Sequence, residues 1–179
     1  MRSSVGGRAR STRSRQSDGL TTVDFFTTTH RIVAQVQTGS RPLSDQMNDR
    51  SQSFVLVFNV RLSRLEKDAG LEAIASAAYL SKENVGFVIA PSKEIRKPER
   101  GRYTAYEREV LVTLPGFELE GRFLGPQRSD LWTFSPATLD PFFVLTAATA
   151  RIAGVPDVTM GGDAILVNRD RIESICLGD

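Results

Sequence analysis

The chain has 179 residues, of which 40% are hydrophobic and 25% charged, which is an ordinary composition for a globular protein with a core. No apolar run approaches the roughly 18 residues that a membrane-spanning helix needs, so we expect a soluble protein. The single cysteine, Cys176, excludes an internal disulfide framework, which fits a reducing, cytoplasmic location or a protein that needs no disulfides.

The formal net charge of +2 is unevenly distributed along the chain. Residues 1–22 carry five arginines against one acid, so this segment holds +4 and the remainder −2. Because Ser, Gly and Arg dominate the segment without apolar periodicity, we predict a disordered basic arm. A solubilising tail and an organellar targeting segment fit the same composition. The candidate phosphate contacts of the arm are Arg2, Arg8, Arg10, Arg13 and Arg15.

Two extended runs follow the arm, and a similar pair occurs 87 residues later. Residues 23–36 (VDFFTTTHRIVAQV) match residues 110–123 (VLVTLPGFELEGRF), with mostly apolar or small residues at corresponding positions. In each copy apolar residues alternate on both sides of a central turn, which is Pro-Gly in the second copy. This pattern predicts two β-hairpins.

A second repeated block follows each hairpin. An arginine and a Ser-Asp pair precede a Phe-led apolar run, and we expect long strands within residues 53–62 and 141–152. Ser and Asp are common cap and turn residues, so we expect the pairs to cap or turn the chain, with each arginine pairing with its aspartate. The alternative is a carboxylate that acts as acid, base or metal ligand. The residues concerned are Arg41, Ser44, Asp45, Arg128, Ser129 and Asp130.

The first copy contains an additional segment, residues 65–84, whose apolar residues recur at helical spacing. This spacing predicts a helical insertion at about 66–82. A third block then pairs residues 86–95 with residues 163–172, which places Ile95 on Ile172. The residues that carry the helical pattern are Leu71, Ile74, Ala75, Ala78 and Tyr79.

Three blocks in the same order predict an internal duplication. We expect a mainly β fold of two tandem small β-barrel units, at residues 23–95 and 110–179, joined by a charged linker at 96–109. The residues expected to point inward are Phe25, Ile32, Val55, Val57, Val112, Leu119, Val144, Ile165 and Leu166.

The second hairpin, the Asp-led turn and the strands that follow resemble the Sm-like small-barrel pattern. Gly121 matches the glycine of its second strand, and residues 45–48 (DQMN) match its Asp before a Met-Asn pair. The resemblance implies Sm-like barrels and assigns no RNA-contacting residue. The run RPLSDQMN, residues 41–48, also resembles an RxLSDxxN-type motif of uncharacterised bacterial β-rich proteins, which implies no activity.

The residue types needed for catalysis are scarce. His30 is the only histidine, which excludes two-histidine motifs, and we expect neither it nor Cys176 to be catalytic, although a Cys-His dyad is the alternative. Residues 160–163 (MGGD) lack the Lys and Ser/Thr of a phosphate-binding loop and predict a tight turn. Trp132 and Phe134 are expected in the core or at an interface, with base stacking as the alternative.

Two functions follow from these features, and neither is enzymatic or needs a cofactor or metal. The first is a scaffold or interaction module that self-associates or binds a protein partner through edge strands or the surface around Trp132. The second is a nucleic-acid-binding protein that contacts phosphates through the basic arm. The negative charge of the remainder favours the first, because a basic surface normally supports phosphate binding.

Overall fold

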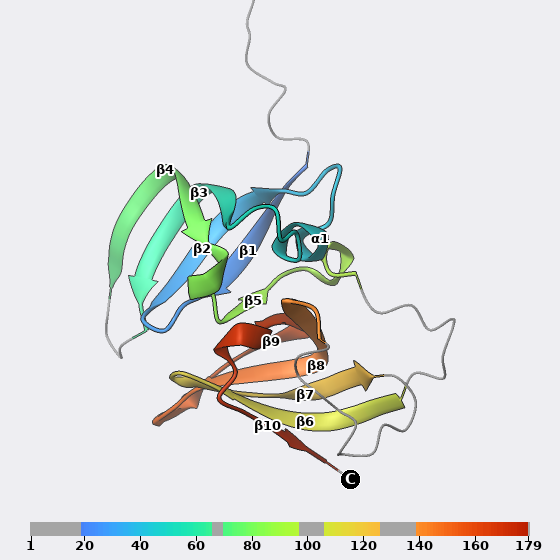
Figure 1. Cartoon of the computed structure of the whole chain (residues 1–179). Helices are drawn as coiled ribbons and strands as arrows, with labels where there is room; N and C mark the ends of the chain where they lie inside the picture. The colour runs from blue at the N-terminus through green and yellow to red at the C-terminus, as the bar shows by residue number, and fades with distance from the viewer. Residues whose placement is uncertain (1–18, 66–69, 97–105, 126–138, 179) are drawn as a thin grey trace, which may run out of the picture.

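A computed structural model of the chain describes residues 19–65, 70–96, 106–125 and 139–178 (Figure 1). These residues form mainly β structure, with ten strands in one antiparallel sheet, so the mainly β prediction is confirmed. In Figure 1 the blue to green strands of the first half lie above the yellow to red strands of the second half. No helix in the described ranges is long and apolar enough to cross a membrane.

The first half starts with the predicted hairpin, and a short helix then leads into two long strands. The first strand begins at Leu20, so the predicted disordered arm at 1–22 extends too far at its end. Alternating apolar residues in the hairpin strands put every second side chain on the core, as a half-buried strand requires. The elements are β1 (Leu20–Phe26), β2 (His30–Gln37), α1 (Leu43–Met47), β3 (Phe54–Arg64), β4 (Leu71–Ser81), the 3₁₀ turn η1 (Lys82–Asn84), β5 (Phe87–Ile89) and the 3₁₀ turn η2 (Ser92–Glu94).

The second half also starts with a hairpin, in which Gly116 adopts a φ of 82° in the predicted Pro-Gly turn. Its β6 begins inside the segment predicted as linker, and residues 97–105 lie outside the described part. The elements are β6 (Tyr106–Leu114), β7 (Phe117–Gly125), β8 (Phe142–Ile152), β9 (Val155–Asn168), the 3₁₀ turn η4 (Arg169–Arg171) and β10 (Ser174–Leu177).

The strand order across the sheet is β10-β6-β7-β8-β9-β5-β1-β2-β3-β4. The first half therefore contributes β5-β1-β2-β3-β4, and the second half contributes the corresponding order β10-β6-β7-β8-β9. Antiparallel pairing of β5 with β9 joins the halves. The sheet is open, with β10 and β4 at its two ends, so the prediction of two separate closed barrels is wrong. The two halves form one sheet because β5, at the edge of the first half, pairs with β9, at the edge of the second half.

The two halves also share their pairing register. Phe25 lies opposite Ile32 in the first hairpin, and Val112 lies opposite Leu119 at the corresponding place in the second. The pairing of β2 with β3 shifts register near Asn59, and the pairing of β7 with β8 shifts register near Ala147. Asn59 and Ala147 are the two non-glycine residues with positive φ among those described, which indicates a β-bulge at each. Bulges bend a sheet locally, so both halves bend at the same strand.

Two cores lie on opposite faces of the sheet near its centre. One is built mainly from the first half and the other mainly from the second. Strand β9 has side chains in both, because Leu166 points into the first core and Ile165 into the second. Eight of the nine residues expected to point inward are buried, and Val144 is half-buried against the first core.

The predicted helix at about 66–82 is wrong, because residues 71–81 form strand β4. Spacing alone fits a helix there, and alanine favours helices. However, β3 offers a long unpaired edge, and β4 pairs with it from Phe54–Ser81 to Ser63–Leu71. Tertiary pairing thus overrides local propensity. Residues 66–69 lie outside the described part.

Two further sequence predictions need correction. The third repeat block was misaligned, because β5 corresponds in strand order to β10, whereas residues 163–168 belong to β9, the counterpart of β4. Residues 160–163 form part of β9 rather than a tight turn. A side chain at Gly161 would place its Cβ 2.9 Å from the backbone oxygen of Ala148, so this glycine permits close approach of the bulged strand.

Candidate interaction surface

Strand β4 forms one end of the sheet and pairs only with β3 among the described strands. It is eleven residues long, and residues 73–81 (AIASAAYLS) contain no charged side chain. Natural proteins usually block such an edge with lysine, proline, a bulge or a covering loop, because its free N–H and C=O groups pair readily with another strand. The uncharged part of this edge, residues 73–81, is therefore a candidate site for strand pairing.

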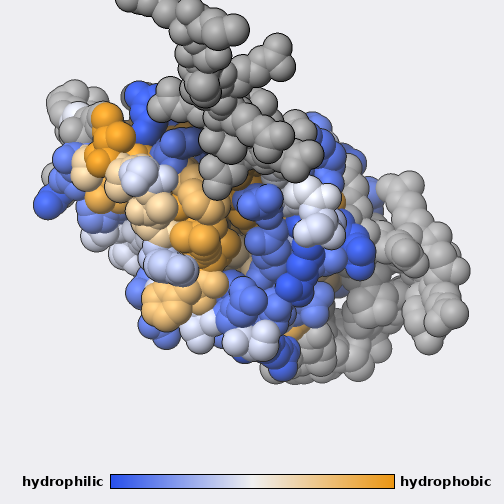
Figure 2. Space-filling view, turned by 90° about the horizontal axis from the view of Figure 1, so that it is seen from above, coloured by the Kyte–Doolittle hydropathy of each residue, from blue (hydrophilic) through white to orange (hydrophobic). Residues whose placement is uncertain are grey.

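The outer face of β3 and β4 is also apolar. Phe54 is 53% exposed, Leu56 39% and Tyr79 72%, and Leu56 lies directly opposite Tyr79 across the two strands. Figure 2, which views the molecule from above, shows a hydrophobic band flanked by hydrophilic residues. We refer to the exposed Phe54, Leu56, Ala77 and Tyr79 as the β3–β4 patch. Contiguous exposed apolar residues of this kind mark interaction surfaces.

The same surface exists in the second half, where it is covered. Phe142 lies opposite Asn168 at the start of β8, as Phe54 lies opposite Ser81 at the start of β3. Val144 opposite Leu166 likewise corresponds to Leu56 opposite Tyr79. By this register the counterparts of the β3–β4 patch are Phe142, Val144, Ala164 and Leu166, all of which lie in or against the first core.

The first core packs over that second-half surface, and pairing between β9 and β5 joins the two. Leu166 lies opposite Val88, and Ile165 lies opposite Ile89. Both Leu166 and Val88 are fully buried, so the junction of the halves excludes water around them. Among the described residues, the β3–β4 patch is thus an exposed counterpart of a surface that the chain buries at its own centre.

Two asparagines reinforce this junction with hydrogen bonds between the halves. The side chain of Asn48, just after α1, donates to the backbone oxygen of Phe142 (2.9 Å) and accepts from its backbone nitrogen (2.7 Å). Buried Asn168 at the end of β9 donates to the backbone oxygens of Lys82 (3.1 Å) and Val85 (2.8 Å). These bonds tie side chains of one half to backbone groups of the other.

The residues of the first Ser-Asp motif hold α1 in place. Arg41 pairs with Asp49 at 2.7 Å rather than with the Asp45 carboxylate, and Asp45 pairs with Arg96 at 3.4 Å. The predicted cap at Ser44 is wrong, because its buried hydroxyl accepts instead from the backbone N–H of Arg96 at 2.9 Å. Asp45 does lie in the first helical turn, as expected.

Polar and charged groups also surround the side chain of Asp49, which follows α1. Hydrogen bonds from Ser51 and Arg41 hold the pKa of the Asp49 carboxyl well below its ordinary value. The buried amine of Lys82 donates to the backbone oxygens of Gln46 (2.5 Å) and Asp49 (3.0 Å). Desolvation lowers the pKa of this amine. These interactions fix the loop between α1 and β3 and pair the carboxylate of Asp49 with Arg41 and Ser51.

His30 and Cys176 lie on different halves of the sheet, on β2 and β10. The ring of His30 contacts Glu72 at 3.0 Å, and Arg64 also binds the Glu72 carboxylate. Hydrogen bonds from Arg64 and then His30 lower the pKa of Glu72. The geometry therefore does not bring the histidine and the cysteine into one dyad.

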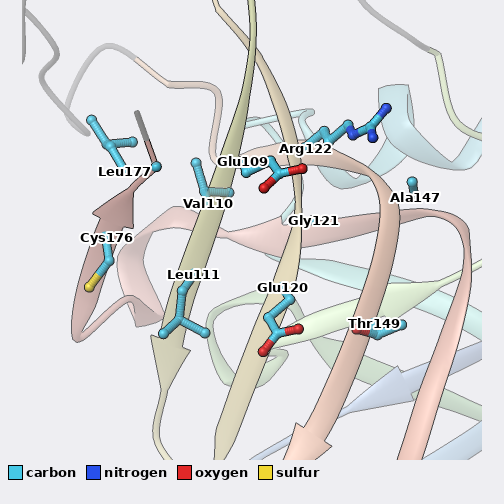
Figure 3. A pocket seen from close by; sticks show the side chains of 11 residues that line it. Glu109, Val110, Leu111, Glu120, Gly121, Arg122, Ala147, Thr149, Cys176 and Leu177 are labelled. Atoms are coloured by element: carbon cyan, nitrogen blue, oxygen red, sulfur yellow. The ribbon is translucent and has the colours of Figure 1, made fainter.

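A hollow of about 580 Å³ lies on the outer face of the second half, where Cys176 is exposed (Figure 3). Cys176, Leu111, Glu120 and Thr149 form one row across β10, β6, β7 and β8. The Glu120 carboxylate is paired with Arg151 at 3.0 Å, so its charge is already balanced. Within the described ranges, no group of three or more His, Cys, Asp or Glu residues is placed to hold a metal ion.

Several predicted site residues lie outside the described part of the chain. They are the arm residues Arg2, Arg8, Arg10, Arg13 and Arg15, the second motif Arg128, Ser129 and Asp130, and the aromatic pair Trp132 and Phe134. Comparison of the chain with protein-family models, curated protein sequences and solved structures finds no match.

Sequence reasoning missed the β3–β4 patch and both asparagines of the junction. One signal for the patch was present, because residues 73–81 combine β-compatible apolar residues with a complete lack of charge. The assignment of this run to a helix concealed it. The asparagine contacts span 83 to 94 residues of sequence, and no local pattern indicates them.

Proposed function

We propose that the chain is a non-catalytic structural module that assembles with copies of itself through the end of its sheet at β4. The observation that carries this proposal is the pair of equivalent positions Tyr79 and Leu166, one exposed and the other buried at the junction of the halves. Surfaces that are already complementary within one chain favour assembly of several chains by the same contact.

The proposal includes an internal duplication of one five-stranded unit. Matching strand order, matching register and bulges at Asn59 and Ala147 support it. The Sm-like resemblance of the sequence is a further part of the proposal, supported by a hairpin-led five-stranded unit in each half and limited by the open sheet.

Nucleic-acid binding through the arm is the second candidate, and the five arginines favour it. Two basic residues at and after η2, Lys93 and Arg96, each have an acidic partner. Arg96 pairs with Asp45 at 3.4 Å, and Lys93 lies 4.0 Å from Glu94. Phosphate contacts by paired arginines and lysines would first require these ion pairs to break, so we place self-assembly first.

The two functions respond differently to salt. Multi-angle light scattering of the full chain over a range of concentrations is expected to show a mass that rises above the monomer and changes little with salt, because apolar contact and backbone pairing carry the association. A monomer at every concentration would contradict the proposal.

Retention on a nucleic-acid column at low and moderate salt tests the second candidate. Steeply salt-dependent retention, lost when the five arm arginines are replaced by glutamine in the full chain, would favour nucleic-acid binding instead.

A further inference from the structure

We propose that β4 of one copy pairs with β10 of the next copy, in an antiparallel register that places Tyr79 opposite Ile175 and Ala78 opposite Cys176. The inference rests on the proposed self-assembly and specifies the edge that meets β4. It follows from treating the pairing of β5 with β9 as a template, because β10 is the counterpart of β5 and β4 is the counterpart of β9.

The register comes from the strand pairs within the chain. Strand β5 lies against β1 with Val88 opposite Phe25, and β10 lies against β6 with Ile175 opposite Val112. Since Phe25 and Val112 are equivalent in the two hairpins, Ile175 takes the place of Val88. The template pairs Val88 with Leu166, and Tyr79 is the counterpart of Leu166.

Both edges have apolar side chains that this pairing would cover. Val85 and Val88 are fully buried at the internal junction, whereas their counterparts Ile172 and Ile175 are only half-buried against the second core. Leu177, the counterpart of Ala90, is half-buried as well. Within one copy, the first core packs against the outer face of β8 and β9. In the proposed contact, the half-buried side of the second core would pack in the same way against the β3–β4 patch of the neighbouring copy.

The proposed register also places the paired side chains of β10 and β4 on the same faces of the sheet as those of β5 and β9. Ile89 of β5 packs against the second core, on the side where Ile165 lies. Cys176 takes the place of Ile89 and Ala78 takes the place of Ile165, so both would face the first core of the copy that supplies β4. Neither residues 73–81 nor residues 174–178 contain a charge that pairing would desolvate.

A contact between β4 and β4 of two copies is the competing arrangement. It would bury the β3–β4 patch of each copy against that of the other. The half-buried side of the second core and the edge of β10 would gain no contact. The head-to-tail contact covers both ends and repeats from copy to copy, so it builds rings or longer chains instead of closed dimers.

Cysteine cross-linking distinguishes these arrangements, because directly opposed residues in antiparallel strands lie about 4.5–5.5 Å apart at Cα, within disulfide range. One full-length protein carries Ala78→Cys with Cys176→Ser, and the other is the natural chain with Cys176. The two are mixed and treated with oxidised glutathione, which takes up two electrons as two thiols lose their protons and form one disulfide. The matched control replaces Ala78→Cys with Ala77→Cys, whose side chain points to the opposite face of β4.

We expect a mixed dimer joined between position 78 and Cys176, identified by peptide mass, and loss of this product with the Ala77→Cys control. Dimers of the Ala78→Cys protein with itself would overturn the inference in favour of β4–β4 pairing. Absence of the mixed cross-link in protein that light scattering shows to be associated would overturn the β10 contact while leaving self-assembly in place. A protein that is monomeric throughout would overturn both proposals.

Discussion

Tyr79 and Leu166 occupy equivalent positions on β4 and β9, and Tyr79 is 72% exposed where Leu166 is fully buried. Leu166 lies in the first core, beside Val88 of β5, which pairs with β9. Tyr79 has no such neighbour among the described strands. The apolar surface of β9 is therefore buried at the junction of the halves, whereas the equivalent surface of β4 is exposed at the end of the sheet.

Asn48 is expected to stabilise the internal junction. Replacement by alanine removes both hydrogen bonds to the backbone of Phe142 and leaves those backbone groups without that partner. We predict a loss of about 1–3 kcal/mol in the free energy of unfolding, measured by urea denaturation. Asn84→Ala, at an exposed asparagine in η1, is the matched control. Equal stabilities of the two variants would contradict the role assigned to Asn48.

Ser44 is expected to contribute to stability without taking part in assembly. Ser44→Ala removes the acceptor of the Arg96 backbone N–H, and we predict a cost of about 1 kcal/mol. Denaturation measures the cost, and light scattering on the same sample should give the mass distribution of the natural chain. A folded Ser44→Ala protein that no longer associates would instead place α1 in the contact surface.

Glu72 gives β4 a pH-dependent attachment to β2 and β3. Hydrogen bonds from Arg64 and His30 lower its pKa below the usual 4.5, so the folded state favours the carboxylate. The stability gained is fully present above 4.5 and is lost as the pH falls through the lowered value. The part of the stability difference between the natural chain and Glu72→Gln that comes from the Glu72 carboxylate should therefore shrink as the pH falls below 4.5. Acid titrations followed by circular dichroism test this, and a difference that grows on acidification would contradict it.

Much of the sheet could be predicted from sequence because its hairpins and long strands have local signals. Alternating apolar residues and the Pro-Gly turn at Gly116 indicated the hairpins, and the Phe-led runs indicated β3 and β8. Strand β4 was missed because Ile74, Ala78 and Tyr79 fit helical spacing, and only pairing with β3 decides between the two structures.

The candidate surface is harder to predict, since exposure depends on what pairs with a strand. The residues of β4 and β9 differ little in polarity near Tyr79 and Leu166, yet β5 pairs with β9 and not with β4. Strands as short as β5 and β10 carry little periodic signal, and their misalignment in the third repeat block hid the equivalence of the two sheet ends.

The most direct test of the account is sedimentation equilibrium of full-length Ala77→Lys. Ala77 is the counterpart of fully buried Ala164, so a lysine there would place an unpaired charge in the proposed contact while staying exposed in a single copy. Ala153→Lys, at an exposed alanine in the turn between β8 and β9, adds the same charge away from the contact. We expect Ala77→Lys to fold as a monomer while Ala153→Lys associates like the natural chain; association of Ala77→Lys with undiminished strength would contradict self-assembly through β4.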